Sequence, residues 1–232
     1  MAKKRSKRYE EAAKLVDSEK HYSLDEAMTV VKKFPGLKFD QSVTISFKMG
    51  VDPKQSDQMV RGTCPLPHGS GKEVRVLVFA EGEAATSAKN AGAEHVGYEA
   101  MIKKVQEGWV DFDVVVATPA AMAEVRKLGR QLGPRGLMPN PKTGTVTEDT
   151  AEAVNAVKAG RVDFKLDRNG NISVAVGKAS FEPQQLVDNA KAVIDSVIAA
   201  KPASAKGVYL QSGTIAATMS PGVKVDISAY RD

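Results

Sequence analysis

The chain has 232 residues, of which 42% are hydrophobic and 26% are charged, values that are ordinary for a globular protein with one or two packed cores. It lacks an apolar run of 18 residues, which excludes a membrane-spanning helix, and its single cysteine, Cys64, excludes an internal disulfide framework. The net charge of +5 lies in the first eight residues, which hold five basic and no acidic residues; the remaining 28 basic and 28 acidic residues balance. A nucleic acid would therefore have to bind a local surface.

The basic N-terminus has two interpretations. It lacks a following apolar stretch, so no secretory signal is expected, and the lone cysteine fits a reducing compartment such as the cytoplasm. The basic arm is then either a solvated, disordered tail or a phosphate contact, and its composition does not decide between them.

The first part of the chain predicts two helices and a half-buried strand. One helix is expected over residues 6–17. A second begins after Ser23, the expected N-cap, with Glu26 as its capping-box partner, and ends before Pro35. From residue 39 to 49, apolar and hydroxyl-bearing side chains alternate, which indicates a strand with one face in the core.

The middle of the chain changes character twice. Residues 50–73 are rich in glycine and proline and predict an irregular linker. Residues 74–132 then alternate short apolar runs with helical patterns, which is typical of a parallel sheet with helices on both faces. The expected strands are 74–80, 95–96 and 113–117, and the expected helices are 83–91, 98–107 and 119–132, the last with Thr118 as N-cap.

The last part returns to hairpin-like patterns after a Gly/Pro-rich loop. The Asn169-Gly170 turn predicts a hairpin. A long amphipathic helix follows, with Glu182 as N-cap and Gln185 as its capping-box partner. The expected elements are a helix over 148–158, hairpin strands over 162–166 and 172–176, a helix over 183–200, and strands over 207–218 and 223–227.

This order of elements predicts two domains of mixed α/β and α+β class. Residues 1–67 and 160–232 would form one discontinuous α+β domain, because both have hairpin-type patterns. Residues 68–159 would form a Rossmann-like, three-layer αβα domain inserted into it. Two chain crossings would then form a double hinge.

Sequence patterns for enzymatic chemistry are weak. The three histidines are far apart and lack neighbouring ligands, so no metal site is expected, and no cofactor is expected either. Gly69–Lys72 resembles the end of a P-loop, but Leu66 replaces its first glycine and Glu73 follows its lysine. The first strand-to-helix turn of the middle block carries Glu81 and Glu83, which would repel a pyrophosphate.

Two segments could bind a partner. The loop from Leu132 to Pro141 is either a rigid turn or a binding loop that presents Arg135. The turn over 216–222 holds small hydroxyl residues and Met219. With the polar face of the strand over 39–49, this turn could contact RNA riboses and backbone, or it could be a plain hairpin with a solvated face.

Taken together, these segments resemble the large-subunit ribosomal protein L-one family of bacteria. The resemblance covers nearly the whole chain, and the 132–141 loop and the Thr218-Met219 turn are its most specific parts. The resembling stretches are Lys38-Phe39-Asp40, Ser56-Asp57-Gln58, Val60-Arg61-Gly62-Thr63, Leu66-Pro67-His68-Gly69, Leu132 to Pro141, Val176-Gly177-Lys178, Ala205-Lys206-Gly207 and Thr218-Met219.

The resemblance implies a domain of both chain ends that binds rRNA, a Rossmann-like insertion, and no catalysis. It further implies a monomer when free, a place in the mobile stalk beside the tRNA exit site, help in the release of deacylated tRNA, and repression of its own operon through a leader mRNA that mimics the rRNA site. The family's contacts map to Lys38, Phe39, Ser42, Thr44, Lys165, Asp167, Arg168, Ser212, Thr218, Met219 and Ser220.

Two of these positions depart from the family. It usually has an acidic residue where this chain has Thr44, and glycine where this chain has Ser220. The side chain of Ser220 could therefore crowd the RNA or move the turn.

Three hypotheses follow: an rRNA-binding structural protein that also represses translation, a Rossmann-type enzyme, and a protein-interaction module that uses the 132–141 loop. The first hypothesis has its required hydroxyl-rich face and Thr-Met turn, whereas the second lacks phosphate-binding glycines.

Overall fold

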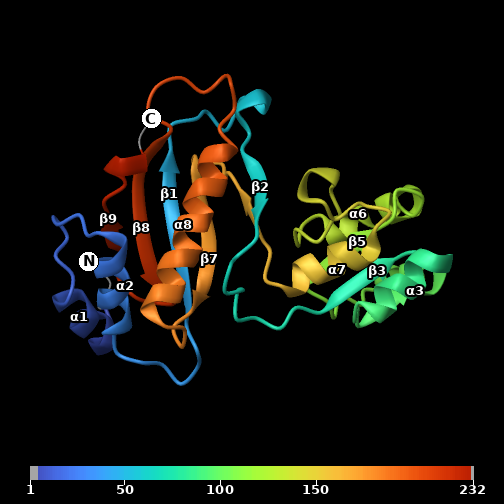
Figure 1. The fold of residues 1–232 in the computed structure, drawn as a ribbon, viewed down its shortest axis with the longest axis horizontal. Coiled ribbons are helices and arrows are strands. Elements are labelled where there is room, and N and C mark those ends of the chain that lie inside the picture. The colour runs from blue at the N-terminus through green and yellow to red at the C-terminus, as the bar shows by residue number, and fades with distance from the viewer. Residues whose placement is uncertain (1–4, 231–232) are drawn as a thin grey trace. The chain divides into compact units, whose positions relative to one another are not determined.

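The computed structural model describes residues 5–230 and divides into two compact units (Figure 1). Unit 1 consists of the described residues up to Gly71 and those from Val162 onward, and unit 2 is Lys72–Arg161. The boundaries lie a few residues C-terminal to the expected ones. Lys3 and Lys4 of the predicted basic arm lie outside the described residues.

Unit 1 is built on antiparallel strands. Its elements are α1 (Lys7–Lys14), α2 (Leu24–Lys32), β1 (Ser42–Met49), a 3-10 turn (Ser56–Gln58), β2 (Arg61–Cys64), β6 (Val162–Lys165), β7 (Asn171–Lys178), α8 (Pro183–Ala199), β8 (Leu210–Ala217), β9 (Val223–Val225) and a 3-10 turn (Ser228–Tyr230). Four strands form a sheet in the order β7-β1-β8-β9, and β2 pairs with β6. Helix α8 crosses in front of the four-stranded sheet in Figure 1.

Local sequence determines where the two main helices of unit 1 begin. The Glu26 N–H donates to Ser23 Oγ at 3.2 Å, and the Ser23 N–H donates to Glu26 Oε2 at 3.4 Å, which confirms the first predicted capping box. At α8, the Glu182 N–H donates to Gln185 Oε1 at 3.0 Å and Pro183 occupies the first helical position, which confirms the second.

The core of unit 1 lies between the sheet and its helices. As the alternation predicts, Val43, Ile45 and Phe47 of β1 are buried, and they belong to one apolar cluster with side chains of α2 and α8. Because both helices pack on this face, the other face of the sheet carries side chains of the opposite parity.

One polar side chain is fully buried in this core. Asn189 of α8 accepts a hydrogen bond from the His68 N–H at 3.0 Å and donates to the carbonyl oxygens of Gly69 at 3.0 Å and Val176 at 2.7 Å. It therefore fastens the segment that precedes unit 2 to the end of β7.

The predicted hairpin around Asn169-Gly170 is wrong, because β6 pairs with β2 and β7 pairs with β1. The Leu166 N–H donates to the Val60 carbonyl at 2.9 Å, which directs β6 toward the β2 side. The turn itself is closed by the Asp167 N–H, which donates to the Asn171 carbonyl at 2.8 Å, and by the Asp167 carboxylate, which accepts the Asn169 N–H at 2.8 Å. Beyond these bonds β6 and β7 belong to different sheets.

Two other strand predictions need correction. The segment expected to be irregular contains β2, in which Gly62 leaves room for the ring of Phe164 on the paired strand; an added Cβ would lie 2.7 Å from that ring. Strand β1 begins at Ser42, so Lys38 and Phe39 lie in the loop before it.

Unit 2 has a three-layer architecture. Its elements are β3 (Val76–Phe79), α3 (Gly82–Asn90), β4 (His95–Gly97), α4 (Glu99–Gln106), β5 (Val114–Ala117), α5 (Met122–Val125), a 3-10 turn (Arg126–Leu128), α6 (Gly129–Leu132), a 3-10 turn (Pro141–Thr143) and α7 (Thr150–Lys158). The strands are parallel in the order β4-β3-β5. One apolar cluster joins the sheet to α4, α5 and α6, and the other joins it to α3 and α7, so helices lie on both faces as predicted.

The single helix predicted over 119–132 is interrupted. The structure has α5, a 3-10 turn and α6 in succession, and the residue before α5 is Ala121 rather than Thr118. Thr118 Oγ1 instead accepts the Ala121 N–H at 3.3 Å, in the turn that precedes α5. Gly129, a weak helix former, stands where the 3-10 turn gives way to α6.

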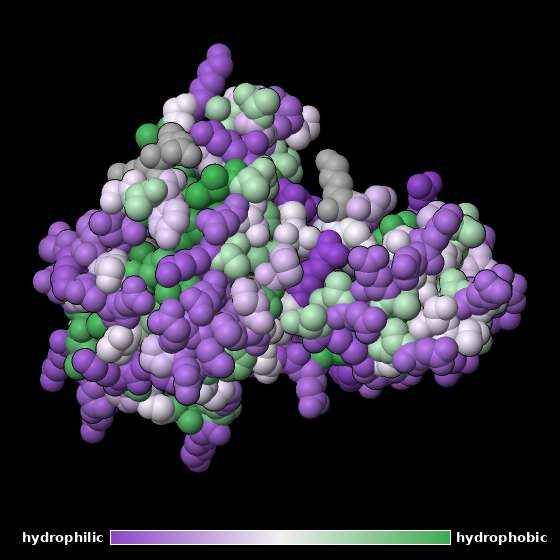
Figure 2. All heavy atoms as spheres, viewed as in Figure 1, coloured by the Kyte–Doolittle hydropathy of each residue, from purple (hydrophilic) through white to green (hydrophobic). Residues whose placement is uncertain are grey.

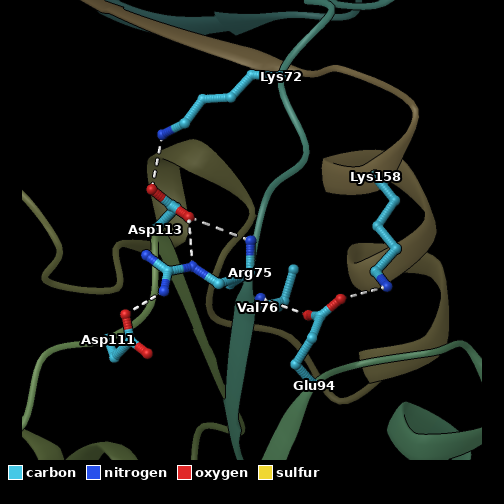
Figure 3. A network of polar contacts seen from close by, with 7 residues as sticks. All are labelled: Lys72, Arg75, Val76, Glu94, Asp111, Asp113 and Lys158. Carbon is cyan, nitrogen blue, oxygen red and sulfur yellow. Dashed lines mark hydrogen bonds and ion pairs between the residues drawn. The ribbon is translucent and has the colours of Figure 1, made fainter.

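Charged side chains tie together the N-terminal ends of the strands of unit 2 (Figure 3). Lys72 Nζ lies 2.6 Å from Asp113 Oδ1, and the Arg75 N–H donates to Asp113 Oδ2 at 3.2 Å. Arg75 also pairs with Asp111. The first residue of unit 2 is thereby fixed to the start of β5.

A second ion pair fixes the last helix of unit 2. Glu94 accepts hydrogen bonds from Lys158 Nζ at 2.8 Å and from the Val76 N–H at 2.7 Å. Burial alone would raise the pKa of Glu94, but these hydrogen bonds outweigh it and lower the pKa from its ordinary value. The end of α7 is thus fixed to the segment before β4 (Figure 3).

We expect Asp113→Asn to destabilise unit 2 at neutral pH by about 1 kcal/mol. The hydrogen bond from Lys72 lowers the pKa of Asp113 below its ordinary value of 3.8. A depressed native pKa contributes stability above the unfolded pKa, and that contribution is lost as pH falls through the native pKa. Urea unfolding should be measured at pH 7 and at pH 3 or below. The difference in free energy of unfolding between Asp113→Asn and wild type should be smaller at the low pH. Asp111→Asn, on a more exposed carboxylate, is the control. If Asp113→Asn lowered the free energy of unfolding equally at both pH values, its effect would not come from the ion pairs of the Asp113 carboxylate.

Candidate nucleic-acid interface

The face of the four-stranded sheet opposite α2 and α8 carries hydroxyl-bearing side chains together with two alanines, an asparagine and a lysine. All of them are half-buried or exposed. In register across three strands they are Thr44 with Ala175 and Ala216, Ser46 with Ser173 and Thr214, and Lys48 with Asn171 and Ser212. We call these nine residues the open face; the opposite, helix-covered face is the one in Figure 2, where apolar side chains lie in small areas between hydrophilic ones.

The turn between β8 and β9 presents Met219 at one end of the open face. Its side chain is 72% exposed, the highest fraction of any large hydrophobic side chain between residues 5 and 230. Its φ of +56° is in the left-handed region, which is uncommon for a residue with a Cβ. Such a conformation persists only when its surroundings impose it, so the contacts of the turn matter.

Hydrogen bonds fix the turn on both sides of Met219. The Ser42 N–H donates to Thr218 Oγ1 at 3.1 Å, and the Thr218 N–H donates to the Ser42 carbonyl at 3.1 Å. On the other side, Ser220 Oγ accepts the Ala217 N–H at 2.9 Å. The main chain next to Met219 is therefore rigid, and its side chain is left in solvent.

A β-bulge adds a basic residue that the sequence analysis did not assign to the site. The register of β1 and β7 shifts between Val43 and Thr44, and this shift brings Lys178 beside Ser42. Lys178 Nζ donates to Ser42 Oγ at 3.0 Å. Strict alternation along β7 would have placed Lys178 with the buried Val176, so the pattern alone could not reveal it.

The loop before β1 brings Lys38 and Phe39 near the same end of the sheet. Both side chains are exposed, Phe39 by 51%. Next to them, the Asp40 carboxylate accepts hydrogen bonds from the N–H of Ser180 at 3.1 Å and from its hydroxyl at 2.7 Å. The loop is thus fastened to the segment after β7, and Phe39 precedes Ser42 by three residues.

The other predicted residues lie toward the opposite end of β1. Ser212 is opposite Lys48, whose ammonium group donates to the Asn169 carbonyl. Lys165, Asp167 and Arg168 are exposed in β6 and in the turn after it. The structure thus separates the eleven predicted residues into two groups, with seven near Met219 and four at the far end.

Asp167 differs from its neighbours because its carboxylate is engaged in its own turn. Hydrogen bonds from the N–H groups of Asn171, at 2.7 Å, and Asn169, at 2.8 Å, lower the pKa of Asp167 below its ordinary value. The carboxylate is therefore ionised and shapes the turn that presents Arg168.

A Rossmann-type enzyme would use the C-terminal edge of the parallel sheet in unit 2. That edge has a hollow of about 280 Å³ lined by Glu81, Tyr98, Thr118 and Glu148, among others. Its two carboxylates disfavour a pyrophosphate. Between residues 5 and 230, no group of three His, Cys, Asp or Glu could hold a metal ion. Within the same range, no helix has the length and hydrophobicity to cross a bilayer.

Residues 31–221 match the model of the family described as "Ribosomal protein L1p/L10e family". The chain belongs to this family. The predicted family is thereby confirmed. Members of the L1p/L10e family are structural, non-enzymatic proteins that bind rRNA in the ribosome, and this chain is accordingly an rRNA-binding structural protein.

The matched range contains all eleven predicted contact residues and excludes α1. At Thr44 and Ser220, the two positions expected to depart from the family pattern, the hydroxyl groups have intramolecular partners. Thr44 Oγ1 donates to the Ala216 carbonyl at 3.3 Å, and Ser220 Oγ closes the turn as described above. Both side chains are thus accommodated within unit 1.

Proposed function

We propose that this protein binds large-subunit rRNA through the open face and the Met219 turn. As part of the ribosomal stalk it would help deacylated tRNA leave the exit site. It would also repress translation of its own operon by binding a leader mRNA that resembles the rRNA site. The free protein would be a cytoplasmic monomer.

The rigid, exposed Met219 turn is the observation that carries this proposal. Hydroxyl groups suit contacts to RNA 2′-hydroxyls and backbone, and an exposed apolar side chain can pack on a ribose or base. The proposed contacts near the turn are Lys38, Phe39, Ser42, Thr44, Thr218, Met219 and Ser220, together with Lys178. Those of the far group are Lys165, Asp167, Arg168 and Ser212.

Competition between the two RNAs tests the proposal directly. The purified protein should retain a large-subunit rRNA fragment in high salt on a filter, and leader mRNA should displace that fragment. Variants in the Met219 turn should weaken both complexes by the same factor. If the protein retained only one of the two RNAs, or if a turn variant weakened the two complexes by different factors, the two RNAs would not share one surface. For the tRNA role, ribosomes lacking the protein should release deacylated tRNA more slowly until it is added back.

We expect unit 2 to be dispensable for rRNA binding. Residues 72–161 hold 12 basic and 12 acidic residues, so they offer no net positive charge. A short Gly/Ser linker between Gly71 and Val162 should preserve affinity within about 2 kcal/mol, or roughly 30-fold. The measurement is filter binding of a variant shown to be folded by circular dichroism and cooperative unfolding. A larger loss would show that unit 2 touches the RNA.

We expect rRNA affinity to depend only moderately on salt. Outside the first eight residues, the charges of the chain balance. Each phosphate neutralised contributes about 0.7 to 0.9 to the slope of log K against log salt, so a few basic contacts predict a slope of only a few units. Affinities at several salt concentrations measure it, and a slope of about −8 or steeper would indicate many more phosphate contacts.

A further inference from the structure

The start of α1 and the Met219 turn enclose an open hollow of about 440 Å³. It is lined by Arg5, Ser6, Arg8, Tyr9, Met219 and Ser220. We propose that this hollow holds one nucleotide of the bound RNA, with Arg5 as a phosphate contact and Arg8 as a positioning residue for Met219. The inference rests on the proposed function and adds to it residues outside the range matched by the family model.

Helix α1 is fixed firmly enough to form one wall of such a site. Ser6 caps it by accepting the Tyr9 N–H at 3.3 Å. Ala12 is fully buried in the core of unit 1, and the Asp17 N–H after the helix donates to Tyr22 Oη at 3.0 Å. The side chains of its first turn therefore have a fixed place relative to the sheet.

Arg8 joins α1 to the turn. Its Nη2 donates to the main-chain carbonyl of Met219, the residue held in the left-handed conformation. Its Nη1 is buried and has no hydrogen-bond partner among residues 5–230. An arginine supplies several donors in a fixed plane, so Arg8 can hold the Met219 carbonyl in place and thereby position the Met219 side chain.

Arg5 and Tyr9 form the other side of the hollow. The Arg5 guanidinium lies 4.6 Å from the centroid of the Tyr9 ring, a cation–π distance. The residues that line the hollow include two arginines and no acidic residue. A nucleotide fits this chemistry, because its phosphate can pair with Arg5 while its ribose or base packs on Met219 and Tyr9.

Three single variants, measured on the large-subunit rRNA fragment, test the two arginines. Arg5→Gln should weaken binding by at least about fivefold and reduce the salt slope by about 0.7 to 0.9, as the loss of one phosphate contact requires. Arg8→Lys should weaken binding comparably with an unchanged slope, because the charge stays while the planar donor geometry is lost. Lys7→Gln, at the first residue of α1 and not among the residues that line the hollow, is the charge-matched control and should change affinity less than about twofold.

A double-mutant cycle tests whether Arg8 acts through Met219. In the Met219→Ala background, Arg8→Lys should lose most of its effect, whereas additive effects would overturn the positioning role. If Lys7→Gln weakens binding as much as Arg5→Gln, the basic residues act through nonspecific electrostatic attraction to RNA, and the proposed nucleotide site is wrong. If both arginine variants bind with wild-type affinity while Met219→Ala binds more weakly, this inference is overturned and the proposed function stays intact. Wild-type affinity of Met219→Ala would overturn the proposed interface itself. If Arg8→Lys does not fold, Arg5→Gln still decides the phosphate contact.

Discussion

Replacing Met219 with alanine is expected to weaken rRNA binding by about 1–3 kcal/mol, or roughly 5- to 150-fold, while Tm barely changes. The side chain is 72% exposed and the turn is held by hydrogen bonds of its neighbours, so truncation removes little from the core. A packed nucleotide would lose its apolar contact, and the loss would appear in affinity rather than in stability.

A buried methionine provides the matched control. Met28 of α2 has no exposed surface, so Met28→Ala should lower the free energy of unfolding by about 2–5 kcal/mol and leave the affinity of the folded fraction unchanged. Calorimetry and filter binding on both variants give the comparison. If Met219→Ala instead lost several kcal/mol of stability and bound rRNA normally once folded, Met219 would be a core residue. Phe39→Ala, at a half-exposed position, should follow Met219→Ala with a smaller effect.

Replacing Asn189 with alanine is expected to lower the free energy of unfolding of unit 1 by about 3 kcal/mol. The change leaves three main-chain groups without their partner: the N–H of His68 and the carbonyl oxygens of Gly69 and Val176. The Val176 carbonyl is buried, so its loss of a partner costs more than the hydrogen bond itself contributed, whereas the His68 N–H and the Gly69 carbonyl are part-buried.

Urea unfolding measures this effect, with Gln184→Ala as the control on the same helix. Gln184 is exposed and its side chain donates to the exposed side of α8, to Asp188 Oδ1 at 3.1 Å, so its loss should change stability by less than about 0.5 kcal/mol. A change below about 1 kcal/mol for Asn189→Ala would mean that water enters and satisfies the three groups.

Local features of the fold were predictable, and strand pairing was not. The capping boxes at Ser23 and Glu182 depend on residues three apart, so the sequence specifies them directly. The alternation of β1 and the apolar runs of β3 and β5 likewise follow from neighbouring residues. Strand β6, however, pairs with a segment about a hundred residues earlier, and no local pattern at the Asn169-Gly170 turn distinguishes that partner from β7.

Part of the candidate site was likewise predictable from the sequence, and part depends on contacts that the sequence does not reveal. The hydroxyl face followed from strand parity, and the resemblance to the L1p/L10e family pointed to the Met219 turn. Lys178 escaped prediction because a bulge changes parity within one strand. Arg8 escaped because its contact with Met219 spans 211 residues, and a basic arm gives no sign of what it touches.

The central place of β1 has a consequence for synthesis. Both of its neighbours, β7 and β8, come from residues beyond 170, whereas β3, β4 and β5 lie within residues 76–117. A nascent chain can therefore close the sheet of unit 2 long before β1 finds either partner. The Ser42–Thr218 hydrogen bonds that hold the Met219 turn need residue 218, so they can form only when nearly the whole chain has been synthesised. The proposed RNA surface would then be complete only in a nearly finished chain, and shorter nascent chains would not compete for the RNA.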